Sequence, residues 1–269
     1  MNSPIWQAAY GDGPLVACAI HAGHNLRPEL AGLFRLDDQQ RLYEEDPYTG
    51  EWTSIAPTRI IGRRSRFEVD LNRPRDKAVY QRPEDAWGLE VWRTPPPPDA
   101  VERSLAAYDE FYCQWNTVLK RLLERNGRVV VLDLHSYNHR RQGPDGPPAE
   151  PGENPEINLG TRSLDRGRWS PVIERFLAEL RSYDYLGESL DVRENVKFFG
   201  GHLAQWTHAH FPESVCVLAV EVKKIFMDEW TGQLDQARFD AIHQALDQAA
   251  AGIRDVLLDW NRGVSIDQI

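Results

Sequence analysis

Three histidines and a glutamate stand at positions from which they could form one metal-centred site. His21, His24, His135 and Glu221 each come at or just after the end of an apolar, strand-like run. In open α/β sheets, ligands bind outside the carboxyl ends of the strands, so we expect these side chains to meet there. Imidazole nitrogens bind borderline metals such as zinc, and a catalytic zinc site keeps one position open for water. The sequence therefore predicts a zinc centre that activates water, with a nearby carboxylate to accept the proton.

The segment SRFEVDLNRP, residues 65–74, carries a second set of reactive side chains. Asp70 is placed to orient a ligating imidazole, as carboxylates commonly do in zinc sites. Arg66, Asn72 and Arg73 supply hydrogen-bond donors, and the planar guanidinium group pairs with a carboxylate through two parallel bonds. These residues predict a substrate with an anionic group.

Strand-like and helical segments alternate along the chain, which predicts how these residues are positioned. Short apolar runs predict strands, and apolar residues at three- and four-residue steps predict helices. The predicted strands are 15–20, 129–134, 215–221 and, as one strand or two adjacent strands, 58–61 and 65–71. The predicted helices are 105–126, 171–182 and 235–260. Such alternation is typical of a three-layer αβα sandwich with a mixed, mostly parallel central sheet.

Polar or proline- and glycine-rich segments separate these elements. We expect residues 1–269 to form a single domain in which loops at about 25–57, 75–98 and 142–170 line the site. The proline run 95–98 is expected to be a stiff connector, because candidate site residues fall on both sides of it.

Composition and charge indicate which binding partners and which cellular location are expected. The net charge of −10 argues against a nucleic-acid-binding surface. No apolar stretch reaches the roughly 18 residues that span a bilayer. The three cysteines form no CxxC pair, and the N-terminus lacks the features of a signal peptide, so we expect a cytoplasmic protein. No feature of the sequence predicts the oligomeric state.

Six short segments, in order, resemble the N-formylglutamate amidohydrolase family, a branch of the zinc carboxypeptidase superfold. They are HAG (21–23), SRFEVDLNRP (65–74), DLHS (133–136), NLGT (158–161), GG (200–201) and Glu221. The resemblance covers roughly residues 15–232. It implies the fold of zinc carboxypeptidase and phosphorylase/hydrolase-like proteins, with one zinc ion per chain.

The resemblance also implies a role for each matching residue. His21 and His135 match metal ligands, and Glu221 matches the general base. Asp70 matches the partner of the first histidine. Asn72 and Arg73 match the pair that binds a substrate carboxylate. Arg66 is expected either to polarise the substrate carbonyl or to bind its carboxylate, and Asn158, in the NLGT segment, is expected to line the substrate pocket.

One position departs from the zinc carboxypeptidase pattern and leaves the second protein ligand open. Those enzymes carry a glutamate ligand three residues after the first histidine, where this chain has His24. Glu68 interrupts a predicted buried strand and shares one face of it with Asp70, because side chains alternate along a strand. Either His24 is the ligand and Glu68 orients it, or Glu68 is the ligand and His24 lies behind it. We favour the first.

The sequence therefore predicts a metal-dependent hydrolase of a small acidic N-acyl amino acid such as N-formylglutamate. Two alternatives share the same residues. One is a carboxypeptidase or amidase that acts on short peptides or cell-wall fragments, and the other is a sensor that binds acyl amino acids without turnover.

Overall fold

Seven strands form one central sheet in the computed structural model, which describes residues 4–261. Their order across the sheet is β1 (Trp6–Ala9), β3 (Thr58–Gly62), β2 (Leu15–Ala19), β4 (Val129–Tyr137), β9 (Val215–Lys223), β5 (Ile157–Gly160) and β8 (Val192–Glu194). Four neighbouring pairs are parallel, whereas β1 with β3 and β5 with β9 are antiparallel. The mixed, mostly parallel sheet predicted from the sequence is confirmed.

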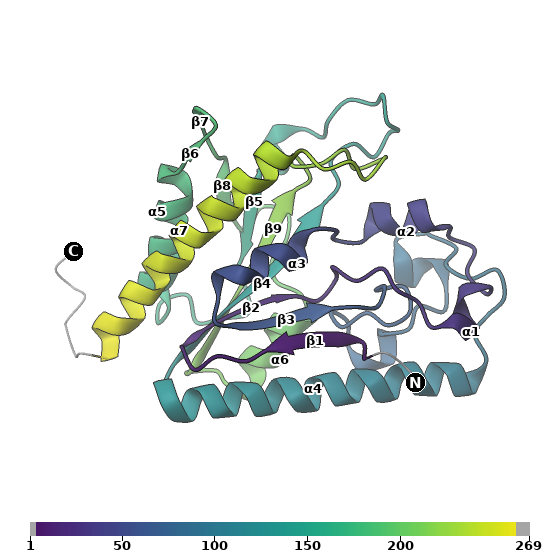
Figure 1. Cartoon of the computed structure of the whole chain (residues 1–269), viewed down its shortest axis with the longest axis horizontal. Coiled ribbons are helices and arrows are strands. Elements are labelled where there is room, and N and C mark those ends of the chain that lie inside the picture. The colour runs from purple at the N-terminus through teal and green to yellow at the C-terminus, as the bar shows by residue number, and fades with distance from the viewer. Residues whose placement is uncertain (1–3, 262–269) are drawn as a thin grey trace.

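Helices cover both faces of this sheet (Figure 1). One face packs against α4 (Pro98–Asn126) and α6 (His202–His210), and the other packs against α5 (Ser170–Ser182) and α7 (Gln236–Asn261). The three-layer αβα sandwich is therefore confirmed. Shorter elements complete the fold: α1 (Pro28–Ala31), α2 (Asp38–Glu44), α3 (Thr49–Trp52), four 3₁₀ turns (Thr53–Ile55, Arg75–Lys77, Pro83–Ala86, Pro151–Glu153) and the hairpin of β6 (Asp184–Tyr185) with β7 (Glu188–Ser189).

Alternation along β4 explains how the sheet presents polar groups. Val129 and Val131 point into the core beneath α4, whereas Val130, Leu132 and Leu134 point toward α5 and α7. Side chains in a strand alternate between faces, so the α4 face continues with Asp133 and then His135. The same face of the sheet thus changes from apolar to polar at its carboxyl end.

The segment 65–71, predicted as a strand, is instead a series of turns. Glu68 N–H donates to Ser65 O, and Asp70 N–H donates to Ala78 O rather than to a neighbouring strand. The four consecutive residues Phe67, Glu68, Val69 and Asp70 are all buried. Apolar residues at alternate positions suggested a strand with one buried and one exposed face. In the structure, both sets of side chains are buried, so the pattern does not mark a strand.

The structure also differs from the prediction at short elements and at a helix that begins with proline. Strands β1, β5 and β8 and helix α6 were not predicted; each has nine residues or fewer. Helix α4 begins at Pro98, inside the run expected to be a connector. Proline is well tolerated at the first position of a helix because its missing N–H would have no partner there.

Gly160 marks a close approach that the fold needs beside the site. A Cβ atom there would lie 2.5 Å from the backbone nitrogen of Gly200. We expect Gly160→Ala to lower the free energy of unfolding by about 1–3 kcal/mol, as overpacking does in cores. Urea unfolding measures it, with Gly32→Ala as the control, because no atom lies within 4 Å of a Cβ at Gly32. Equal midpoints for the two variants would contradict the expectation.

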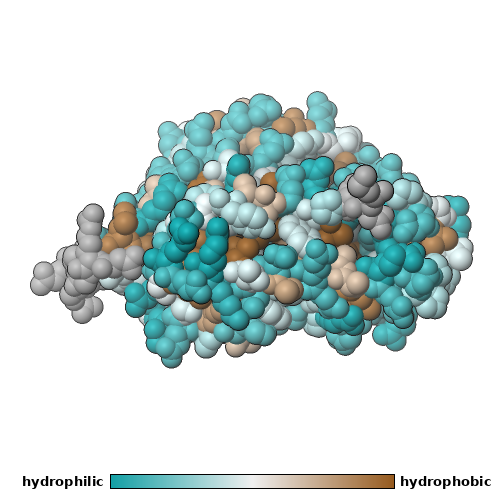
Figure 2. All heavy atoms as spheres, turned by 60° about the horizontal axis from the view of Figure 1, so that its bottom comes forward, coloured by the Kyte–Doolittle hydropathy of each residue, from teal (hydrophilic) through white to brown (hydrophobic). Residues whose placement is uncertain are grey.

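The surface over α4 is mainly polar. Figure 2 shows a face on which hydrophilic side chains predominate and hydrophobic ones form separate small areas. Among residues 4–261, no helix combines the length and the apolar character needed to cross a membrane.

Candidate active site

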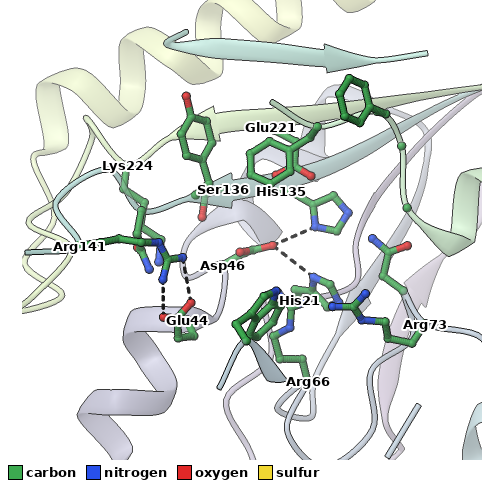
Figure 3. A pocket seen from close by; sticks show the side chains of 18 residues that line it. His21, Glu44, Asp46, Arg66, Arg73, His135, Ser136, Arg141, Glu221 and Lys224 are labelled. Atoms are coloured by element: carbon green, nitrogen blue, oxygen red, sulfur yellow. Dashed lines mark hydrogen bonds and ion pairs between the residues drawn. The ribbon is translucent and has the colours of Figure 1, made fainter. Parts of the chain in front are cut away.

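A buried cluster of His21, Asp46 and His135 lies at the carboxyl end of the sheet (Figure 3). His21 follows β2, His135 lies near the end of β4, and Asp46 follows α2. One side-chain atom from each lies within 4.8 Å of the other two. Asp46 Oδ2 is 2.9 Å from His135 Nδ1 and 3.5 Å from His21 Nδ1. Both imidazoles thus turn the same nitrogen toward one carboxylate oxygen.

A second carboxylate lies behind each imidazole. His21 Nε2 is 2.7 Å from Asp70 Oδ1, and His135 Nε2 is 3.0 Å from Asp133 Oδ1. In metal sites, a ligating histidine commonly donates its other N–H to a carboxylate, which fixes the ring orientation. This arrangement leaves the two Nδ1 atoms to face Asp46.

Buried negative charge dominates the electrostatics of the cluster. Burial opposes ionisation of Asp46, but its hydrogen bond with His135 and its electrostatic attraction to His135 and His21 outweigh that effect and lower its pKa. Burial likewise opposes ionisation of Asp70, whose pKa is nevertheless lowered because Arg66 and His21 stabilise the carboxylate. Buried charges need partners, so a cation beside these carboxylates would stabilise them.

These residues fit a divalent metal ion such as zinc. His21 Nδ1 is buried and has no hydrogen-bond partner among residues 4–261. Two imidazole nitrogens and one carboxylate oxygen make up a ligand set typical of catalytic zinc, which leaves a position for water. The cluster is therefore a candidate metal site.

Glu221 faces the same space from β9. It is paired in register with His135 on the neighbouring strand, and both line a cavity of about 320 Å³. Burial raises the pKa of Glu221 to about 7, although the nearby His135 opposes the shift. A carboxyl group with such a pKa exchanges protons readily near neutral pH.

The model of the N-formylglutamate amidohydrolase family matches residues 13–227. The chain belongs to the N-formylglutamate amidohydrolase family. The family establishes an enzyme of the amidohydrolase class, as the sequence predicted.

Solved structures show the same fold. An N-formylglutamate amidohydrolase from Ralstonia eutropha JMP134 is similar with a TM-score of 0.73 and 16% identity, over 96% of this chain and 99% of that chain. A gene product from Agrobacterium tumefaciens has a TM-score of 0.63 and 19% identity, over 93% of this chain and 96% of that chain. No curated protein matches the chain by sequence.

His24 is not part of the cluster, contrary to the prediction. Its Nδ1 lies 2.6 Å from Glu45 Oε2, and its side chain lines a separate surface groove. Residues three apart share a face in a helix, but no helix directly follows His21 in the described chain. The chain turns at Ala22, whose N–H donates to Ala19 O, and Asn25 then forms a parallel β-bridge with Arg64. The third candidate ligand in this family member is Asp46, which is a carboxylate.

Glu68 is also elsewhere, so neither arrangement proposed for the second ligand is found. Its carboxylate accepts hydrogen bonds from Arg27 Nε at 2.9 Å and Arg64 Nη1 at 3.2 Å. It contacts neither His24 nor the cluster through any hydrogen bond found among residues 4–261. Glu68 anchors two buried arginines, which is a structural arrangement.

The ion pair of His24 with Glu45 predicts a pH-dependent part of the stability. The hydrogen bond to Glu45 raises the pKa of His24. A raised pKa in the folded state stabilises the fold below the unfolded value of about 6.5, and this contribution is lost as the pH rises through the folded pKa. We expect His24→Ala to lower the melting temperature more at pH 6 than at pH 9.

Thermal unfolding at both pH values measures this effect. His243→Ala is the control, because His243 Nε2 pairs with the Ser54 hydroxyl rather than with a carboxylate. The effect is small since the His24 side chain is 38% exposed. If His24→Ala lowered the melting temperature equally at both pH values, the expected pH dependence would be ruled out.

Three of the four predicted substrate-binding residues line the cavity. Arg66 Nη2 donates to Asp70 Oδ2 at 2.9 Å, and the partly exposed Arg73 lies with its Nε 3.9 Å from the same oxygen. Asn72 also lines the cavity, but its Oδ1 accepts the N–H of Leu203 at 2.9 Å and so caps the first turn of α6.

Asn158 does not line the cavity. Its Oδ1 accepts the N–H groups of Val196 and Lys197, and its Nδ2 donates to Phe198 O. These bonds hold the segment that brings Phe198 and Phe199 to the cavity wall. Asn158 therefore positions a loop of the site rather than contacting its interior.

Sequence reasoning missed several residues of the site. Asp46 lies within the expected loop 25–57 but follows no strand, so no spacing rule linked it to His21. Glu44, Arg141 and Lys224 also line the cavity, with Arg141 Nη1 2.8 Å from Glu44 Oε1. Of the other expected loops, 75–98 contributes Trp87, whereas the cavity lining includes no residue of 142–170.

Proposed function

We propose that the protein hydrolyses the amide bond of a small acidic N-acyl amino acid, with N-formylglutamate as the model substrate and zinc as cofactor. One observation carries this proposal: His21, Asp46 and His135 converge in a cavity that Glu221 also lines. We further propose that residues 1–269 act as one catalytic domain, since residues far apart in the sequence meet in this site.

His21 Nδ1, an oxygen of Asp46 and His135 Nδ1 would hold the zinc ion. A bound zinc ion would lower the pKa of water to roughly 7 and polarise the acyl carbonyl. Asp70 would keep the His21 ring oriented, because it accepts a hydrogen bond from the far ring nitrogen, and Asp133 lies 3.0 Å from the far ring nitrogen of His135.

Glu221 serves as the base and then as the acid. Its carboxylate accepts a proton from the attacking water, and the carboxylic acid then returns that proton to the nitrogen of the leaving amino acid. A pKa of about 7, raised by burial, suits both directions of transfer near neutral pH. Because Glu221 and His135 are register partners on adjacent strands, the rigid sheet fixes the position of the base.

Cationic residues at two ends of the cavity support an acidic substrate. Arg66 and Arg73 lie on one side of the cluster, and Arg141 and Lys224 lie on the other (Figure 3). Lys224 is buried, and its Nζ donates to the carbonyl oxygens of Tyr43 and Glu45. Burial lowers the pKa of Lys224 to about 8, so a substrate carboxylate nearby would favour its charged form.

Replacing Arg73 tests the carboxylate site. We expect Arg73→Gln to raise KM for N-formyl-L-glutamate by about tenfold or more with little change in kcat, because a charge-assisted hydrogen bond contributes about 1.5–3 kcal/mol. Steady-state kinetics measure this split. The control is Arg103→Gln, which removes an exposed arginine that pairs with Asp99 on α4. A fall in kcat with unchanged KM would argue against a binding role for Arg73.

The experiment that tests the function is a substrate panel with zinc-loaded protein. We expect release of formate and glutamate from N-formyl-L-glutamate, and slower turnover of neutral N-acyl amino acids. Faster cleavage of dipeptides would favour the carboxypeptidase reading instead. Binding of N-formyl-L-glutamate without turnover would favour the sensor.

A further inference from the structure

Trp87 adopts a backbone conformation that bulky residues rarely occupy. Its φ is 55° and its ψ is 26°, in the left-handed region, at the end of the 3₁₀ turn Pro83–Ala86. Glycine usually fills such a position after a helical turn, and here Gly88 is the next residue. A non-glycine residue at positive φ is strained, and such strain clusters at functional sites.

Packing does not account for a tryptophan at this position. The side chain is 53% exposed and meets Tyr80 edge-on with ring centroids 6.0 Å apart. The core beneath it is made by neighbours such as Ala86 and Val91, which are buried. The fold therefore gains little from a large aromatic group here.

The indole instead contacts two of the arginines that line the cavity, Arg66 and Arg73. Arg66 Cζ lies 4.8 Å from the centre of the Trp87 ring, and Arg73 Cζ lies 5.6 Å from it. All three residues line the cavity that holds the His21–Asp46–His135 cluster. Contacts within about 6 Å of a tryptophan ring are attractive because the guanidinium charge meets the negative face of the ring.

The two guanidinium groups have few other anchors. Arg66 bonds Asp70 through Nη2, but its Nε is buried and has no hydrogen-bond partner among residues 4–261. The side chain of Arg73 is 37% exposed, and its Nε is 3.9 Å from Asp70 Oδ2, beyond hydrogen-bond distance. A flexible arginine loses rotamer entropy when it binds a carboxylate, unless a neighbour already holds it in place.

We propose that Trp87 is a positioning residue for substrate carboxylate binding. Its ring holds Arg66 and Arg73 side by side, so that both guanidinium groups are oriented before the carboxylate arrives. The strained backbone of Trp87 is retained because it places an aromatic ring against both arginines. This inference rests on the proposed function and adds a residue that acts through Arg66 and Arg73.

The test compares Trp87→Asn with Trp87→Phe. Asparagine tolerates the left-handed conformation but removes the ring, whereas phenylalanine keeps an aromatic face. We expect Trp87→Asn to raise KM for N-formyl-L-glutamate by roughly tenfold and to leave kcat within about twofold. Trp87→Phe should raise KM much less, because phenylalanine retains an aromatic ring beside the two arginines. A change in kcat alone, or equal KM values for Trp87→Asn and the unaltered protein, would overturn the proposal.

A double-mutant cycle shows whether Trp87 acts through Arg73. If it does, Trp87→Asn should raise KM by less in the Arg73→Gln background than in the unaltered protein. Fully additive effects would overturn that part of the proposal.

A binding measurement separates this inference from the proposed function. Titration calorimetry with succinate, a dicarboxylate that cannot be hydrolysed, needs no turnover. If N-formyl-L-glutamate is not cleaved but succinate binds about tenfold more weakly to Trp87→Asn, the proposed function fails and the role of Trp87 stands. If succinate binds both proteins equally, or neither, the role of Trp87 is overturned.

Discussion

Replacing Asp46 with asparagine is expected to abolish zinc binding at the proposed metal site. The change removes the negative charge from the oxygen 2.9 Å from His135 Nδ1 and 3.5 Å from His21 Nδ1. We expect zinc affinity to fall by more than a hundredfold, since even outer partners of a ligand contribute about 10- to 100-fold. Turnover should fall with it. Elemental analysis of the purified variant, together with a zinc titration of the apo-protein, measures the loss.

His24→Ala is the matched comparison, and it should keep its zinc. His24 was a ligand candidate from the sequence, yet it lies against Glu45 in a separate groove. Full zinc occupancy in Asp46→Asn, or its loss in His24→Ala, would refute this assignment of the third ligand. Circular dichroism and the melting temperature must show that both variants are folded, because the Asp46 carboxylate also forms a buried hydrogen bond with His135 Nδ1.

Replacing Glu221 with glutamine is expected to abolish most turnover without disturbing the metal. The amide has nearly the same shape but cannot accept the proton of the attacking water. General acid–base catalysis typically contributes a factor of about 10² to 10⁴, so kcat should fall by that amount. KM and zinc content should change little, because Glu221 is outside the His21–Asp46–His135 cluster.

The control for this experiment is Glu188→Gln, an exposed glutamate in the β6–β7 hairpin. It should behave like the unaltered protein. If Glu221→Gln retains its kcat, Glu221 is not the base, and the proposed mechanism must be abandoned. If it loses zinc as well as turnover, Glu221 is instead a ligand.

The fold could be predicted because the buried strands and long helices carry strong periodic patterns. The apolar run in β4 and the repeat in α4 each satisfy a single local rule. The antiparallel strand β5 could not be predicted, because it has four residues next to a proline- and glycine-rich segment. For 65–71, the alternating pattern led to a strand prediction that was wrong. These residues form turns, and consecutive turns can bury apolar and charged residues that are adjacent in the sequence.

For the site, the sequence by itself determined the residues carried by strand ends. The positions of His135 and Glu221 follow from alternation along strands whose carboxyl ends meet at one edge. Only the tertiary structure decided that Asp46 joins them, that His24 turns away, and that Trp87 lies against Arg66 and Arg73. Strand geometry is local and repeats every two residues, whereas the position of a loop residue depends on contacts with segments far away in the chain.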